Sequence, residues 1–283
     1  MKQADRKVKA VYEGKATLEG AGVRLKRVFG FNEVPRFDPF LLLDDFGSRK
    51  PADYIAGFPW HPHRGIETVT YMLHGTVEHG DSLGNKGKIT DGQIQWMTAG
   101  SGIIHQEMPL EQPDFLRGIQ LWVNLPAVDK MMPPRYRDIQ AADVPEFRSE
   151  DGLSVKVIAG RYGRLHGPVR DIVSDPEYLD VRLPAGLEFR HALENGHTVF
   201  AYALEGDGTC STDGTALREG TLAHFGDGGA AALGAGPRGL RFLLVSGKPI
   251  GEPVAWRGPI AMNTKEELAL AFEELRNGTF IKK

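Results

Sequence analysis

A short motif that occurs twice in the 283-residue chain constrains the fold more than any other sequence feature. Residues 70–75 read Thr-Tyr-Met-Leu-His-Gly and residues 201–206 read Ala-Tyr-Ala-Leu-Glu-Gly, so tyrosine, leucine and glycine recur 131 positions apart. Residues 91–94 (Asp-Gly-Gln-Ile) resemble residues 219–222 (Glu-Gly-Thr-Leu) at an offset of 128. A repeat with a nearly constant offset indicates two copies of one structural unit, each of ordinary domain size.

Short apolar runs separated by turn residues occupy most of the chain. Examples are residues 23–29, 67–73, 93–97, 116–124, 155–159, 187–190, 199–204 and 240–245. The chain has 35 Gly and 18 Pro residues, spread out rather than repetitive, which exceeds the usual share of about 12% and is typical of many turns between short strands. We therefore predict an all-β fold of two tandem β-barrels, over residues 1–140 and 141–283, with the boundary in a proline-rich stretch at residues 132–145.

One helix is predicted near the end of the chain. Residues 263–267 (Asn-Thr-Lys-Glu-Glu) have the pattern of an N-cap with a capping box, and Asn277-Gly278 provides a stop. Apolar residues follow the cap at helical spacing, at Leu268, Ala271, Phe272 and Leu275.

Composition excludes several classes of protein. Lys and Arg total 34 against 37 Asp and Glu, a formal net charge of −3, so the chain is not a strongly basic nucleic-acid binder. The apolar stretch Phe40–Leu43 is far too short to span a bilayer, and no secretory signal is visible near the start. A single cysteine, Cys210, excludes a disulfide framework, and a buried or inert thiol is the expected state. We therefore expect a cytoplasmic protein.

Two histidine-containing pairs carry the candidate chemistry. His61 and His63 are two residues apart, as are His105 and Glu107. Side chains two apart on a strand share a face, so antiparallel strands of a barrel would bring three imidazoles and one carboxylate around a single metal ion. Glu67 has the same parity as His61 and His63 unless a bulge intervenes, which makes it a second candidate ligand. Such a donor set suits Fe(II), and also Ni, Co, Mn or Cu.

At these residues the sequence resembles the cupin superfamily and, within it, the pirin family. The resemblance covers essentially the whole chain and is densest from about residue 30 to residue 126. Its motifs include Phe37–Phe46, Gly57–Thr68, Gln95–Gly100, His105–Pro109, Gln120–Pro126 and Gly258–Thr264.

The resemblance implies a bicupin fold with iron(II) in the N-terminal barrel. Carried over from the family, the metal ligands are His61, His63, His105 and Glu107, and Glu107 is preferred over Glu67. At the repeat offsets, His61 and His63 fall on Ala192 and Glu194, and His105 and Glu107 fall on Leu233 and Ala235. The C-terminal barrel therefore lacks the ligand set, and we expect one metal ion per chain and, from the resemblance, a monomer.

The resemblance implies two classes of function. One is an enzyme of the quercetin 2,3-dioxygenase type, which would cleave a flavonol with O2, with Glu107 as ligand and base and a pocket lined by Phe58, Trp60, Met72 and Trp96. The alternative is a non-enzymatic, iron-binding regulator that acts through a protein partner, such as a transcription cofactor or a modulator of a metabolic enzyme. Loss of the flavonol absorption band in the presence of metal and oxygen would distinguish them.

Overall fold

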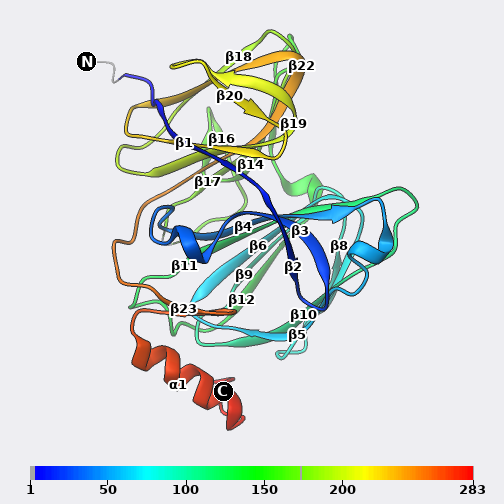
Figure 1. Ribbon diagram of the computed structural model, residues 1–283, viewed down its shortest axis with the longest axis vertical. Helices are drawn as coiled ribbons and strands as arrows, with labels where there is room; N and C mark the ends of the chain where they lie inside the picture. Colours follow the sequence, from blue (N-terminus) through cyan, green and yellow to red (C-terminus); the bar gives the residue numbers. More distant parts are fainter. Residues whose placement is uncertain (1–3, 173, 283) are drawn as a thin grey trace. The chain divides into compact units, whose positions relative to one another are not determined.

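The computed structural model of the protein describes residues 4–172 and 174–282, and nearly all of its regular secondary structure is β (Figure 1). Contacts divide the chain into two compact units. Unit 1 comprises Met1–Gly14 and Ala142–Pro249, and unit 2 comprises Lys15–Ala141 and Ile250–Lys283. The all-β prediction with a single C-terminal helix is confirmed for the described residues. None of their helices is long and apolar enough to cross a membrane.

Unit 1 is built on one nine-stranded sheet, in which every pairing is antiparallel. Its main path runs β1-β21-β19-β22-β17-β14-β13, with β18 paired to β22 and β20 paired to β19. The strands are β1 (Val8–Glu13), β13 (Glu146–Arg148), β14 (Ser154–Ala159), β17 (Glu177–Leu183), β18 (Glu188–Ala192), β19 (Thr198–Cys210), β20 (Thr215–Arg218), β21 (Thr221–Phe225) and β22 (Ala230–Gly247), with a hairpin of β15 (Arg161–Tyr162) and β16 (Leu165–His166). Their inward side chains form one large apolar cluster, which fills the interior of the unit.

Unit 2 contains a seven-stranded sheet, a four-stranded sheet and a two-stranded pair. The sheets have the orders β12-β9-β6-β11-β4-β3-β2, β5-β10-β7-β8 and β23-β24. The strands are β2 (Lys15–Glu19), β3 (Val23–Phe29), β4 (Phe40–Ser48), β5 (Phe58–His63), β6 (Ile66–His74), β7 (Val77–Asp81), β8 (Lys86–Ile89), β9 (Ile94–Thr98), β10 (Ile103–Pro109), β11 (Leu116–Asn124), β12 (Arg135–Ile139), β23 (Ala255–Arg257) and β24 (Ile260–Met262). Three short 3-10 turns are η1 (Phe31–Glu33), η2 (Pro51–Asp53) and η3 (Ala141–Asp143).

The sequence repeat corresponds to equivalent strand pairs in the two units. In unit 2, Tyr71 on β6 lies opposite Ile94 on β9. In unit 1, Tyr202 on β19 lies opposite Leu222 on β21. The glycine that ends each motif has a positive φ, +92° at Gly75 and +78° at position 206, a conformation that favours glycine because it has no Cβ. The two units are therefore two copies of one architecture, as the repeat predicts.

The first strand of the chain belongs to unit 1, which contains mostly C-terminal sequence. The C-terminal helix belongs to unit 2, which contains mostly N-terminal sequence. The expected division at residue 140 places the C-terminal helix with the C-terminal barrel, but α1 (Lys265–Arg276) belongs to unit 2. Ala271 of the helix packs in a cluster with Ile260, Met262 and Phe280. At the start of the chain, β1 pairs with β21 and so belongs to unit 1. Packing between distant segments decides both placements.

The helix itself follows its sequence signals. The Thr264 hydroxyl accepts a hydrogen bond from the backbone N–H of Glu267, and the Glu267 carboxylate accepts one from the backbone N–H of Thr264. This reciprocal capping satisfies two donors that would otherwise lack partners at the helix start.

Candidate metal centre

Two neighbouring antiparallel strands, β5 and β10, hold the histidines of the candidate centre. His61 on β5 lies directly opposite His105 on β10. Burial alternates along β10, so that His105 and Glu107 face inward and Gln106 does not. This is the arrangement that side chains two apart on a strand produce.

Three imidazoles converge closely enough to share one cation. One ring nitrogen from each of His61, His63 and His105 lies within 4.8 Å of the others. Nε2 of His61 is 3.0 Å from Nε2 of His63. The ring centroids are 4.4 to 5.0 Å apart. Neutral imidazole nitrogens are ligands for Fe, Ni, Cu and Zn.

The protonation of the buried imidazoles suits ligation. His63 is 2% exposed and His105 is 1% exposed. Burial is the main cause that lowers the pKa of both rings well below the ordinary histidine value, so both are neutral at pH 7. Among the described residues, neither ring nitrogen of His105 has a hydrogen-bond partner. A buried nitrogen without a partner costs free energy, and a metal ion at this point would satisfy it.

Backbone carbonyls orient two of the rings. Nδ1 of His61 lies 2.8 Å from the carbonyl oxygen of Pro59, and Nδ1 of His63 lies 3.0 Å from that of Pro259. A carbonyl can only accept, so each Nδ1 carries a proton and Nε2 is the nitrogen available to a metal ion. Such partners fix the tautomer and the orientation of metal-binding histidines in proteins.

Glu107 lies beside His105, outside the close group of three histidines, and a neighbouring hydroxyl contacts its carboxylate. Oε2 of Glu107 is 4.0 Å from Nε2 of His105. The Thr70 hydroxyl donates to Oε1 of Glu107 at 2.9 Å and lies 2.6 Å from the Gln120 side-chain amide. With Oε1 occupied by Thr70, Oε2 is the oxygen that lies near His105.

Glu67, the second carboxylate candidate, lies on the face of β6 opposite the one that carries Thr70. Its oxygens accept hydrogen bonds from the Thr98 hydroxyl at 2.6 Å and from the Trp96 indole at 3.1 Å. Burial raises the pKa of Glu67, and these two donors oppose the shift. Thr70, which contacts Glu107, is three residues away and so faces the opposite side of the strand. Gly65, with a φ of +74°, turns the chain between β5 and β6, so the parity expected from an unbroken strand does not apply.

A cavity of about 730 Å³ opens onto His61, His63 and Glu107. Phe58 and Trp60 line it, as predicted. The prediction was wrong for two other wall residues. Met72 packs in an apolar cluster with Phe46 and Tyr54, and Trp96 is fully buried beside Glu67 on the opposite face of β6. Their places are taken by Trp122, whose ring centroid lies 5.0 Å from that of His63, and by Trp256 at 5.8 Å from Trp122.

Several contributors to the centre have no signal in the sequence pattern. Pro259 acts through its backbone carbonyl and lies 196 residues from His63. Thr70 and Gln120 are ordinary polar residues on β6 and β11. The alternation of side chains along a strand predicts which face of β6 carries Thr70, but it does not predict that Thr70 contacts Glu107. His79 is buried on β7, with its ring stacked 6.1 Å from that of Tyr136.

Comparison with known proteins gives consistent matches over the whole chain. The Pirin family model matches residues 22–123, and the model of the Pirin C-terminal cupin domain matches residues 178–281. A Pseudomonas aeruginosa protein named "Putative quercetin 2,3-dioxygenase" is 45% identical over 278 residues, which cover 96% of this chain and 97% of that protein. Pirin of Mus musculus is 40% identical, over 92% of this chain and 88% of its own length.

A solved structure agrees with these matches. The crystal structure of quercetin 2,3-dioxygenase from Acinetobacter baumannii superposes with a TM-score of 0.91 and 34% identity, over 98% of this chain and 99% of that chain. The similarity extends over both cupin domains, and this chain therefore belongs to the pirin family.

Proposed function

We propose that the protein is a metal-dependent dioxygenase that cleaves flavonols such as quercetin with O2 and releases carbon monoxide. The observation that carries the proposal is the convergence of three imidazoles, with a carboxylate beside one of them, at an aromatic-lined cavity. The full-length similarity to the Acinetobacter baumannii quercetin 2,3-dioxygenase supports the choice of substrate.

We propose His61, His63, His105 and Glu107 as the ligands of one iron(II) ion. The partnerless nitrogens of His105 and the carbonyl contacts of His61 and His63 fit this role. When bound, the metal supplies Lewis-acid and one-electron chemistry toward a substrate oxygen and O2. Three nitrogens and one oxygen also suit nickel, cobalt, manganese and copper, so these belong in the test.

The protein's own groups provide proton transfer and positioning. Oε2 of Glu107 takes the proton of the flavonol 3-hydroxyl, while Thr70 holds the other carboxylate oxygen and keeps the side chain in place. Trp122 and Phe58 contribute flat apolar walls against which an aromatic ring can pack. These walls also limit the access of water to the reacting atoms.

The test is turnover of quercetin by the full chain loaded separately with iron(II), manganese, nickel, cobalt and copper. We expect loss of the flavonol absorption band, uptake of O2 and release of carbon monoxide. His61→Ala should abolish both metal retention and turnover, whereas His166→Ala, at an exposed position of unit 1, should leave both unchanged.

Two results would contradict the proposal. Turnover that survives His61→Ala would exclude a metal mechanism at this centre. If the chain binds metal but none of the five metals supports turnover, the result would favour the alternative function, a metal-dependent regulator that acts through a protein partner.

A further inference from the structure

A second group of charged residues lines the same cavity as the histidines. Glu19 on β2, Arg27 on β3 and Asp44 on β4 all contribute to its wall. Arg27 lies opposite Asp44 in the β3–β4 register. The proposed chemistry at the metal does not use any of the three.

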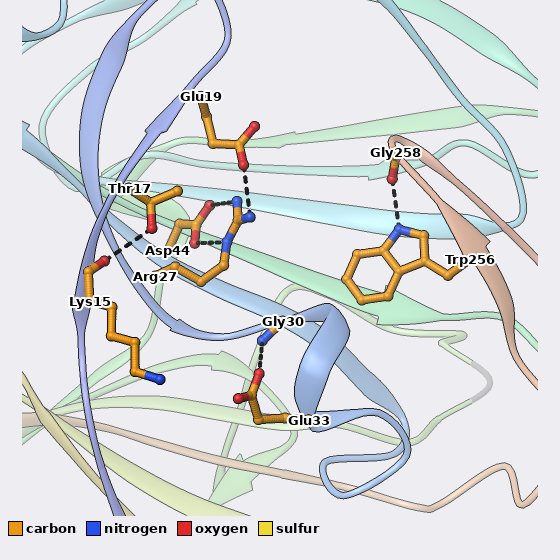
Figure 2. A network of polar contacts seen from close by, with 9 residues as sticks. All are labelled: Lys15, Thr17, Glu19, Arg27, Gly30, Glu33, Asp44, Trp256 and Gly258. Carbon is orange, nitrogen blue, oxygen red and sulfur yellow. Dashed lines mark hydrogen bonds and ion pairs between the residues drawn. The ribbon is translucent and has the colours of Figure 1, made fainter.

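The three side chains form a tightly bonded cluster. Arg27 donates from Nε and Nη2 to the two oxygens of Asp44, at 2.9 and 2.8 Å, and from Nη1 to Oε1 of Glu19 at 2.7 Å (Figure 2). The Asp44 side chain is 6% exposed and that of Glu19 is 40% exposed. Within residues 4–172 and 174–282, this contact with Arg27 is the only hydrogen bond of the Glu19 carboxylate, so Oε2 remains able to accept another.

The cluster has more negative than positive charge. Burial raises the pKa of Asp44 to about 6, against the opposing effect of Arg27, and the contact of both carboxylate oxygens with the guanidinium is that of an ionised group. Two carboxylates therefore face one guanidinium, and the cluster carries a net charge of −1. Other parts of the same wall are apolar, at Leu25, Leu42 and Phe46. A partly desolvated carboxylate in such surroundings gains most from a neutral group that donates a hydrogen bond, and repels an anion.

We propose that Glu19 and Asp44, held in place by Arg27, accept hydrogen bonds from the phenolic hydroxyls that a flavonol carries away from its 3-position. The cluster would thus select polyhydroxylated flavonols over flavonols without these hydroxyls. The inference rests on the proposed function, because it assigns the cluster to the substrate of the same cavity. A ligand that covers Oε2 of Glu19 without donating to it removes this oxygen from solvent and leaves it unpaired, so the analogue without the hydroxyls binds more weakly.

The test compares dissociation constants of two ligands with the same ring skeleton. Quercetin carries four hydroxyls besides the 3-hydroxyl, and 3-hydroxyflavone carries none. Binding is followed by quenching of tryptophan fluorescence, since Trp60, Trp122 and Trp256 line the cavity. The readout is the ratio of the two dissociation constants, which removes general changes in affinity.

Glu19→Met removes both acceptor oxygens with little change in volume, and it should reduce the preference for quercetin by about tenfold, the effect of one hydrogen bond to a charged group. Asp44→Asn should reduce the same ratio, and it tests the deeper carboxylate separately. Thermal unfolding of each variant shows whether it is folded.

Unit 1 offers a matched control. Arg241 donates from Nε and Nη2 to Asp180, at 3.0 and 2.8 Å, and from Nη1 to Glu205 at 2.8 Å. This cluster has the same three residue types but does not line the cavity. Glu205→Met should leave the ratio of dissociation constants at the wild-type value.

The outcomes separate this inference from the proposed function. If the wild type consumes quercetin but Glu19→Met and Asp44→Asn keep the ratio within twofold, the inference is wrong and the proposed function stands. If Glu205→Met lowers the ratio as much as Glu19→Met, the effect is not local to the cavity and the inference is again wrong. If the wild type neither binds nor consumes either flavonol, both proposals are overturned.

Discussion

The interiors of the two units differ sharply although the units share one architecture. Unit 2 places His63, His105 and Glu107 on inward-facing positions next to a cavity. Unit 1 fills its interior with apolar side chains, and Leu233, which corresponds to His105 in the repeat, is fully buried among them. The scaffold therefore tolerates either a polar centre or an apolar core, and a few inward positions on two strands decide which one forms.

The single cysteine illustrates the character of the apolar interior. Cys210, at the end of β19, is fully buried in the core cluster of unit 1. Burial raises the pKa of its thiol to about 12, so almost none of it is thiolate at neutral pH. The side chain packs there as a small apolar group.

Removing one inward-facing histidine from each unit should show the largest difference between them, in the retention of metal. We expect His105→Ala to abolish retention of metal, because loss of a direct ligand exceeds the 10–100-fold cost of losing an outer hydrogen-bond partner. His191→Ala, on β18 of unit 1, should have no effect on retention. Elemental analysis after dialysis measures both, and the wild type should hold one metal ion per chain. Two ions per chain would contradict the comparison.

Truncating one leucine in each unit should distinguish the packed core of unit 1 from the cavity wall of unit 2 by the loss in free energy of unfolding. Leu233→Ala leaves a closed void in the core of unit 1, and we expect a loss of about 4 kcal/mol in the free energy of unfolding. Leu42→Ala enlarges a cavity that is already present in unit 2, and we expect a loss of about 2 kcal/mol. Urea denaturation followed by circular dichroism measures the two values. Equal losses would show that Leu42 is packed as tightly as a core residue, which would contradict the comparison.

The smallest expected effect concerns two carboxylates of unit 2, Glu67 on β6 and Glu107 on β10. Glu67→Gln should change metal affinity by less than about twofold, since Thr98 and Trp96 hold Glu67 away from the histidines. Glu107→Gln removes the charge beside His105 and should weaken binding by at least about tenfold. Competition with a chromogenic chelator measures both affinities. Equal weakening by the two variants would place Glu67 at the metal.

Strand periodicity accounts for how much of the centre the sequence could predict. His61 and His63, like His105 and Glu107, are two apart, and the period of a strand brings each pair to one face without further information. The same rule failed for Glu67 because Gly65 changes the chain direction between the pair and the glutamate. A parity argument holds only along an unbroken strand.

Contacts between distant segments account for what the sequence could not predict. The helix was expected in the C-terminal domain, yet Glu274 forms an ion pair at 2.7 Å with the buried Arg64 of unit 2. Lys130, also buried, donates to the backbone carbonyls of Gly65 and Ala261. Neither partner choice follows from composition or local pattern, because each depends on how segments at least 65 residues apart come together.

The carbonyl of Pro259 that orients His63 has a consequence for synthesis of the protein. A ribosome produces His63 early, then all of Ala142–Pro249, and only afterwards the residue that fixes the tautomer of this ring. On a nascent chain, the metal-binding centre is therefore completed only after residues 142–249 of unit 1 have been translated. Premature termination between positions 106 and 258 would yield a polypeptide with all three imidazoles but without the carbonyl that holds one of them ready.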